Sequence, residues 1–157
     1  MSSSVLVDLP TRRATVIAAR KLAPMLRGRD LIILDGPLGS GKTFFVRALC
    51  RALALPHAER VTSPTFTLVH EYPTEPAMAH ADLYRLNSSG DVLALGLDAM
   101  REDGKLTVVE WGRPYLAELG GDALLLEFAL DPRRLAISAT GPRSREILAT
   151  WVNAAAV

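Results

Sequence analysis

The sequence has a single cysteine, Cys50, among its 157 residues, so an internal disulfide is excluded and a reducing compartment is expected. No apolar run approaches the roughly 20 residues needed to cross a bilayer, and the N-terminus has no signal-peptide pattern. An excess of one charge is missing too: 18 basic and 17 acidic residues leave a formal net charge of +1, which argues against a dedicated nucleic-acid surface. These absences together predict a cytoplasmic protein without a membrane segment.

What is present is an ordinary globular composition. Hydrophobic residues make up 49% and charged residues 22% of the chain, which excludes wholesale disorder. No repeat, low-complexity tract or linker divides the sequence. We therefore predict one α/β domain over residues 1–157, with a P-loop NTPase-like sheet of mixed strand direction flanked by helices.

Apolar periodicity places the secondary-structure elements. Strands are predicted over Val5–Val7, Leu31–Leu34, Phe66–Tyr72, Met78–Leu83, Lys105–Val109, Ala123–Leu130 and Leu135–Thr140. Helices are predicted after a Thr11 cap until near Pro24, over Phe44–Ala54, over Asp91–Leu95 with Asp91 as cap, over Leu97–Arg101 as a further turn, and after Gly141-Pro142. In the last helix, four residues are expected to share one face: Ile147, Leu148, Trp151 and Val152.

The motif with the most chemical content is G-P-L-G-S-G-K-T, between a predicted strand and a predicted helix. This is the context of a phosphate-binding P-loop, whose glycines let backbone N–H groups turn inward while the helix N-terminus adds partial positive charge. Lys42 is expected to reach the β- and γ-phosphates, and the Thr43 hydroxyl to ligate Mg²⁺. The sequence thus predicts nucleotide binding by Pro37, Leu38, Gly39, Ser40, Gly41, Lys42 and Thr43.

Two carboxylates are candidates for the chemistry, because hydrolysis needs charge that positions Mg²⁺ and the attacking water. Glu110 ends an apolar strand and is favoured as the metal residue over a charged residue leaving a sheet edge. Asp82 ends a weaker strand and could equally cap the next turn. Together with Lys42, these two residues form the predicted catalytic set.

Three further positions have open interpretations. Ser63 and Thr65 flank Pro64, where a switch-type loop would carry hydroxyls toward the γ-phosphate, although the residues alone favour an ordinary Ser-Pro turn. Trp111 could pack against the nucleotide, and filling the core is the commoner fate. Cys50 is expected to be a buried, inert thiol.

Other polar residues carry weaker signals. The three histidines lack metal-ligand spacing with any cysteine; His57 and His70 are expected at the surface and His80 in a strand. Four arginines are expected to be solvated turn charges, with contact to the phosphates as the sharper alternative: Arg133, Arg134, Arg143 and Arg145. No N-K-x-D or D-x-x-G motif follows the loop, which disfavours a GTPase, and no arginine-rich kinase lid is evident.

Taken in order, the motifs resemble those of the TsaE (YjeE) family, small bacterial ATPases of tRNA threonylcarbamoyladenosine synthesis. The four matching segments are Gly36–Thr43, Ser63–Val69, His80–Leu86 and Glu110-Trp111, and the likeness covers about residues 9 to 112. Pro37 departs from the family's usual Asp and Ala81 from its usual aromatic residue. The Pro37 side chain is not expected to contact phosphate, and the Ala81 departure is expected to change packing.

The resemblance implies an ATP- and Mg²⁺-dependent ATPase that acts with the TsaD–TsaB heterodimer, which modifies adenosine 37 of tRNA. By position, Lys42 would contact the phosphates, Thr43 and Glu110 would hold Mg²⁺, and Asp82 would lie near the γ-phosphate and be needed for hydrolysis. The Ser63–Thr65 loop would be a nucleotide-sensing switch. The family's N-terminal segment approaches adenine, which makes Thr11 and Thr15 candidates here.

The leading hypothesis is therefore an accessory ATPase with a low intrinsic rate that partners stimulate, since the chain has a phosphate site and two carboxylates but no obvious domain for an acceptor substrate. Two alternatives remain open at this point. One is a small-molecule phosphotransferase, which would place labelled γ-phosphate on a metabolite. The other is a nucleotide-gated binding module without meaningful catalysis, in which Glu110→Ala would leave partner binding unchanged.

Overall fold

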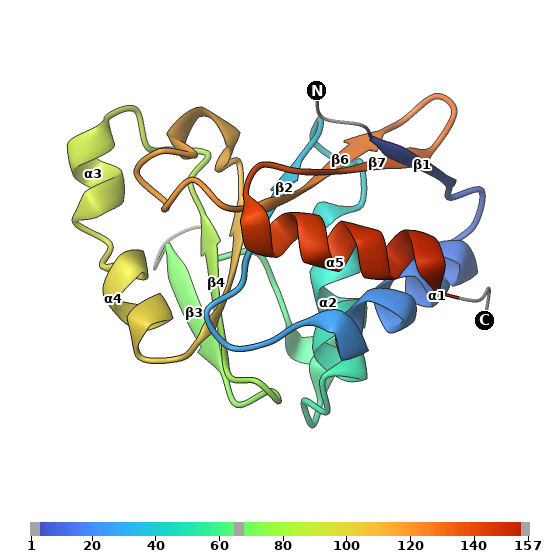
Figure 1. The fold of residues 1–157 in the computed structure, drawn as a ribbon, viewed down its shortest axis with the longest axis horizontal. Helices are drawn as coiled ribbons and strands as arrows, with labels where there is room; N and C mark the ends of the chain where they lie inside the picture. The colour runs from blue at the N-terminus through green and yellow to red at the C-terminus, as the bar shows by residue number, and fades with distance from the viewer. Residues whose placement is uncertain (1–3, 65–67, 155–157) are drawn as a thin grey trace.

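A computed structural model describes residues 4–64 and 68–154 (Figure 1). Within them the strands form one seven-stranded sheet, in the order β1-β7-β6-β2-β5-β4-β3. The strands are β1 (Val5–Asp8), β2 (Leu31–Asp35), β3 (Val69–Tyr72), β4 (Met78–Asp82), β5 (Leu106–Glu110), β6 (Leu124–Ala129) and β7 (Arg134–Ala139). The helices are α1 (Arg12–Leu22), α2 (Lys42–Ala52), α3 (Ser89–Leu93), α4 (Leu97–Glu102) and α5 (Pro142–Asn153). Short 3₁₀ turns cover Ala23–Met25, Ala58–Arg60 and Arg113–Tyr115.

The sheet has mixed strand direction, as the sequence predicts. The central strand β2 runs parallel to both β5 and β6, and β4 continues the parallel part beyond β5. The outer pairs β1–β7, β6–β7 and β3–β4 are antiparallel. Parallel strands point their carboxyl ends to one edge, so the residues that follow β2, β4 and β5 lie close together there.

Helices cover both faces of the sheet, which explains why β2 and β5 are continuous apolar runs. Alternate residues of β2 face opposite cores because side chains in a strand alternate between the two faces. Ile32 and Leu34 pack in the larger core with α1, α2 and α5, whereas Leu31 and Ile33 pack in a smaller core with residues from α3 and α4. The arrangement is a three-layer α/β architecture.

Most predicted elements are present, with boundaries shifted by a few residues. Helix α1 ends before Pro24, as expected, and passes into a 3₁₀ turn. Two details were wrong. Ser88, rather than Asp91, caps α3, because the Ser88 hydroxyl accepts the Asp91 backbone N–H at 3.1 Å. Val152 is 60% exposed instead of sharing the apolar face of α5, since it points away from the sheet.

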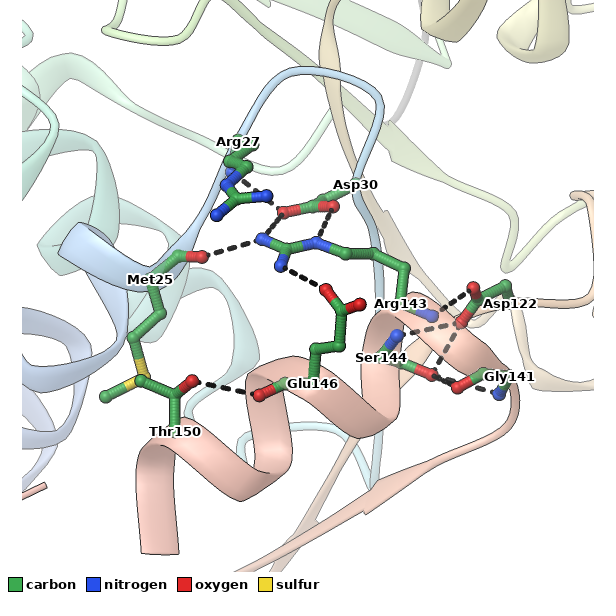
Figure 2. A network of polar contacts seen from close by, with 9 residues as sticks. All are labelled: Met25, Arg27, Asp30, Asp122, Gly141, Arg143, Ser144, Glu146 and Thr150. Atoms are coloured by element: carbon green, nitrogen blue, oxygen red, sulfur yellow. Dashed lines mark hydrogen bonds and ion pairs between the residues drawn. The ribbon is translucent and has the colours of Figure 1, made fainter. Parts of the chain in front are cut away.

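A polar network ties the start of α5 to the start of β2 (Figure 2). The Arg143 guanidinium forms a two-pronged ion pair with the buried Asp30, at 2.8 and 3.0 Å, and also donates to the Met25 carbonyl. The Asp122 carboxylate accepts the backbone N–H groups of Arg143 and Ser144 in the first turn of α5. Arg143 is therefore not the solvated turn charge that was expected. Because the network lies at the amino end of β2, it is separate from the loop at the carboxyl end.

No helix in the described ranges combines the length and the apolar character needed to cross a membrane.

Candidate functional site

The glycine-rich loop joins the carboxyl end of β2 to the amino end of α2. Gly36 and Gly41 have φ values of 141° and 103°, which side chains other than hydrogen rarely allow. A Cβ on Gly36 would also lie 2.5 Å from the Phe128 carbonyl oxygen. Gly41 directly precedes the first residue of α2, so the loop ends at a helix N-terminus with its unpaired N–H groups. This geometry suits an anion.

Lys42 is buried, with only 6% of its surface exposed. Its ammonium donates hydrogen bonds to the carbonyl oxygens of Gly36 and Pro37, the latter at 3.2 Å, and lies 4.1 Å from the centroid of the Trp111 ring. Burial lowers the pKa of Lys42, and the negative charge of Glu110 offsets part of that effect. Two carbonyl groups of the loop therefore hold the desolvated Lys42 ammonium at the N-terminus of α2.

Thr43 and Glu110 meet beside this cation. The Thr43 hydroxyl donates to Glu110 Oε1 at 3.1 Å, and its distance to Oε2 is 3.4 Å. Glu110 is 2% exposed, because it ends β5, a strand paired on both sides, with β2 and with β4. Its second oxygen, Oε2, lies 2.7 Å from Nε2 of His80, a fully buried residue of β4. The predicted pair of metal residues is thus brought together, with a histidine that the motif analysis assigned no role.

Asp82 lies next to Glu110, since the register of the parallel β4–β5 pair sets the two residues opposite each other. Its Oδ2 accepts a hydrogen bond from the Ser63 hydroxyl at 2.6 Å, and its Oδ1 accepts the Tyr84 backbone N–H at 2.9 Å. Asp82 therefore caps the turn after β4 and contacts the predicted switch loop at the same time. Thr65, the other predicted switch residue, lies outside the described residues.

These side chains surround a cavity of about 770 Å³, a size typical of small-molecule sites. Of the predicted residues, those that line it are Thr11, Thr15, Leu38, Gly39, Ser40, Gly41, Lys42, Thr43, Ser63, Asp82, Glu110 and Trp111. Pro37 is not in the lining and contributes its carbonyl to Lys42. Trp111 stands at the cavity wall, where its ring packs on Tyr84 at 5.0 Å, and it also packs, half-buried, against the smaller core.

Several residues of the lining were not predicted as site residues. Among them are Leu9, Pro10 and Arg12, which precede or begin α1. Arg133, expected as a solvated turn charge with contact to the phosphates as the alternative, reaches the cavity from the turn between β6 and β7. The Leu9 backbone N–H donates to the Arg133 carbonyl at 3.0 Å, which brings these two distant segments to the same wall. Only the pairing of β1 with β7 creates this neighbourhood. His80 did carry a sequence signal, because it is two residues before Asp82 and hence on the same face of the strand.

The remaining candidates lie away from the cavity. Cys50 is buried in α2, and desolvation raises its pKa to about 12, as expected of an inert thiol. His57 is exposed, whereas His70 is half-buried and its ring lies 3.2 Å from the Tyr72 hydroxyl oxygen. Arg134 forms an exposed ion pair with Asp8.

The donor set fits Mg²⁺ bound together with phosphate. The Thr43 hydroxyl and the Glu110 carboxylate are hard oxygen ligands, and Mg²⁺ commonly takes one or two protein oxygens plus phosphates and waters. Within the described residues there is no group of three or more His, Cys, Asp or Glu side chains arranged to hold a metal alone. The Ser40 hydroxyl is buried at the cavity without a hydrogen-bond partner among those residues, which leaves it free for a ligand.

The three-layer architecture and the strand–glycine loop–helix unit place the chain in the α/β class of P-loop NTPase-like proteins. Across 97% of its length it superposes on Bacillus subtilis YdiB, covering 96% of that chain with a TM-score of 0.76 and 23% identity, a likeness that concerns the fold.

The family model described as "Threonylcarbamoyl adenosine biosynthesis protein TsaE" matches residues 9–138, and the chain belongs to the TsaE family. Proteins named tRNA threonylcarbamoyladenosine biosynthesis protein TsaE are among its relatives. The Mycobacterium tuberculosis protein is 37% identical over 153 residues, covering 91% of this chain and 83% of that protein. The Streptomyces coelicolor protein is 41% identical over 111 residues, with shares of 68% and 73%. The Aquifex aeolicus protein is 46% identical over 81 residues, with shares of 51% and 61%.

Proposed function

We propose that this chain is a P-loop ATPase that binds ATP with Mg²⁺ and supports synthesis of threonylcarbamoyladenosine at position 37 of tRNA. Membership of the TsaE family connects it with that pathway. The observation that carries the ATPase proposal is the meeting of Lys42, Thr43 and Glu110 at the carboxyl edge of the sheet, beside a cavity large enough for a nucleotide. TsaD and TsaB are the proposed partners.

Each residue has a role that follows from its surroundings. The backbone N–H groups at the start of α2 and the Lys42 ammonium would bind the phosphates, with Lys42 exchanging its two carbonyl contacts for phosphate oxygens. Thr43 and Glu110 would hold Mg²⁺, which when bound neutralises charge on the phosphates. Asp82 would orient the attacking water from the neighbouring strand, and Ser63 would report occupancy through its hydrogen bond to Asp82.

A low intrinsic rate fits this geometry. Asp82 is already engaged by the Ser63 hydroxyl and by the Tyr84 backbone N–H, so neither oxygen is entirely available for water. The cavity is also bordered by exposed side chains, Leu38 at 68% and Tyr84 at 56%, so a bound nucleotide would stay accessible to solvent. A partner that covers this rim and rearranges the Ser63 loop would complete the site.

The testing experiment is reconstitution of tRNA modification with purified TsaD–TsaB, with and without this chain, under multiple-turnover conditions while phosphate release is followed. We expect the chain to be required for repeated turnover and its ATP hydrolysis to rise in the presence of the heterodimer. Glu110→Gln should bind ATP and fail to sustain turnover. Glu127→Gln, a half-buried glutamate of β6 paired with Arg113, is the matched control and should behave as wild type.

Equal hydrolysis rates with and without TsaD–TsaB would contradict the accessory role. Transfer of labelled γ-phosphate to a metabolite would favour a phosphotransferase instead. Full pathway output from Glu110→Gln would mean that nucleotide binding suffices without hydrolysis.

A further inference from the structure

His80 occupies an unusual position for a histidine that touches no cavity wall. It lies in the middle of β4, its side chain has no exposed surface, and it is absent from the cavity lining. Its Nε2 lies 2.7 Å from Glu110 Oε2. The other oxygen of the same carboxylate, Oε1, receives the Thr43 hydroxyl. The two oxygens of Glu110 therefore differ in their shorter contact: Oε2 has His80 inside the sheet and Oε1 has Thr43 at the loop, while Thr43 also lies 3.4 Å from Oε2.

The hydrogen-bond pattern assigns the tautomer of His80. Nε2 must carry a proton to bond with the carboxylate oxygen, while Nδ1 is buried without a hydrogen-bond partner among the described residues. A buried N–H donor without an acceptor costs more free energy than a buried ring nitrogen without a donor, so the proton is assigned to Nε2 and not to Nδ1. The Tyr72 ring lies beside the imidazole, with the two ring centroids 6.3 Å apart. The pattern is that of an imidazole which donates from Nε2 to the glutamate.

Resting on the proposed function, we propose that His80 is a positioning residue for Glu110. By holding Oε2, the imidazole fixes the glutamate side chain so that Oε1 stays beside Thr43, where Mg²⁺ would be bound. The hydrogen bond is needed because a glutamate side chain has three rotatable bonds and would otherwise be free to turn away from Thr43. Partners behind a metal ligand commonly set its orientation in this way.

The substitutions that test this separate the hydrogen bond from the packing. His80→Leu removes the donor and keeps apolar volume, whereas His80→Gln places an amide N–H near the position of Nε2. Thr107→Val is the matched control: Thr107 is a buried β5 residue whose hydroxyl has no partner in the described part of the chain, and it faces the opposite side of the sheet from Glu110.

The assay measures the rate of ATP hydrolysis as Mg²⁺ is titrated, which gives kcat and the Mg²⁺ concentration for half-maximal rate. Compared with wild type, His80→Leu should raise that Mg²⁺ concentration, or lower kcat, by roughly 10- to 100-fold. Its affinity for ADP without Mg²⁺ should stay within about twofold, because the loop and Lys42 bind the phosphates. His80→Gln should recover most of the loss, and Thr107→Val should match wild type. In a Glu110→Gln background, His80→Leu should have no additional effect.

A second measurement needs neither nucleotide nor metal. Nitrogen-15 NMR of the histidine rings in the free protein should show His80 protonated at Nε2 and bare at Nδ1, with a slowly exchanging Nε2 proton. Glu110→Ala should speed that exchange. If His80→Leu does not fold, this spectrum and the comparison of His80→Gln with wild type still test the positioning role.

The outcomes separate the two ideas. If wild type neither binds nor hydrolyses Mg²⁺–ATP, the proposed function is wrong and the positioning role falls with it. If wild type hydrolyses ATP and His80→Leu keeps the same Mg²⁺ dependence and kcat, or the proton sits on Nδ1, the positioning role alone is overturned.

Discussion

Replacing Lys42 by methionine tests the phosphate site most directly. The substitution keeps the aliphatic stem against Trp111 and removes the ammonium that contacts the carbonyls of Gly36 and Pro37. Burial lowers the pKa of Lys42 below its value in the unfolded chain. The charged ammonium, which is the form present at neutral pH, is therefore less favourable in the folded state than in the unfolded state. The lysine therefore opposes folding at neutral pH, and Lys42→Met should leave the unliganded protein at least as stable as wild type.

The cost should appear when nucleotide is added. Losing one charge-assisted contact to phosphate costs about 1.5–3 kcal/mol, which weakens binding roughly 10- to 150-fold. With ATP–Mg²⁺ at about 100 times the wild-type Kd, wild type gains about 2.7 kcal/mol of stability. At the same concentration the variant gains only about 0.3–1.4 kcal/mol. For a chain of this size, that corresponds to a rise in Tm of about 5–11 °C for wild type and about 1–6 °C for the variant.

Thermal unfolding with and without ATP–Mg²⁺ is the assay, and the chain supplies a matched control. Lys21 lies over the Trp151 ring at 4.1 Å, the same separation as Lys42 from Trp111, but it belongs to α1 and is not in the cavity lining. Lys21→Met should therefore keep the full wild-type shift. A Lys42→Met protein with an undiminished shift would refute the assignment of the phosphate site. Equal losses in both variants would mean that the effect is not specific to the loop.

Three further predictions concern the second carboxylate and the network at the far end of the sheet. Asp82→Asn should keep the ATP-induced rise in Tm but lower phosphate release roughly 100-fold; unchanged release would remove Asp82 from the reaction. Arg143→Met should lower the free energy of unfolding by about 3 kcal/mol in urea, because it leaves the buried Asp30 carboxylate without its cation. Arg145→Met, exposed on the same turn, should change it by less than about 0.5 kcal/mol, and similar losses in both would contradict the pairing. Burial alone would raise the pKa of Asp122, but hydrogen bonds from the first turn of α5 outweigh it and lower the pKa. Its stabilisation is thus present above about pH 4 and lost as the pH falls through the lowered pKa, so Asp122→Asn should cost about 1 kcal/mol at pH 7 and progressively less in acid. A constant difference across that range would show that the charge is not involved.

The glycine-rich loop was predictable because its signal is local. The apolar strand, the glycines and the helix lie within about 25 consecutive residues, and their order alone specifies a turn whose N–H groups face one point. The position of Glu110 and Asp82 beside the loop was predictable for a related reason: each ends an apolar run, and parallel strands end at a common edge. The sequence could not establish that their strands are neighbours in register, which the β4–β5 pairing decides.

Arg143 was misjudged and His80 was given no role because their buried partners lie far from them in the sequence. Arg143 was expected in solvent. Glu146, three positions away, is an exposed partner, whereas the buried partner Asp30 is 113 positions away. His80 had no assigned role because Glu110, 30 positions away, is its hydrogen-bond partner. Trp111 was favoured as a core residue, and it does pack against the smaller core, but the sequence did not decide that its ring also lines the cavity.

The sequence by itself determined the elements whose cause lies within a few residues: apolar periodicity, helix and strand limits, and a loop that can cradle an anion. Tertiary structure alone decided which side chains share a site, because strand order and register bring together β2, β4, β5 and the β6–β7 turn from separate parts of the chain. The physical reason is that dihedral preferences and hydrophobic periodicity act over one or two turns. A carboxylate at the end of a strand contacts its partners only after the strands have paired in the sheet, which brings distant segments together.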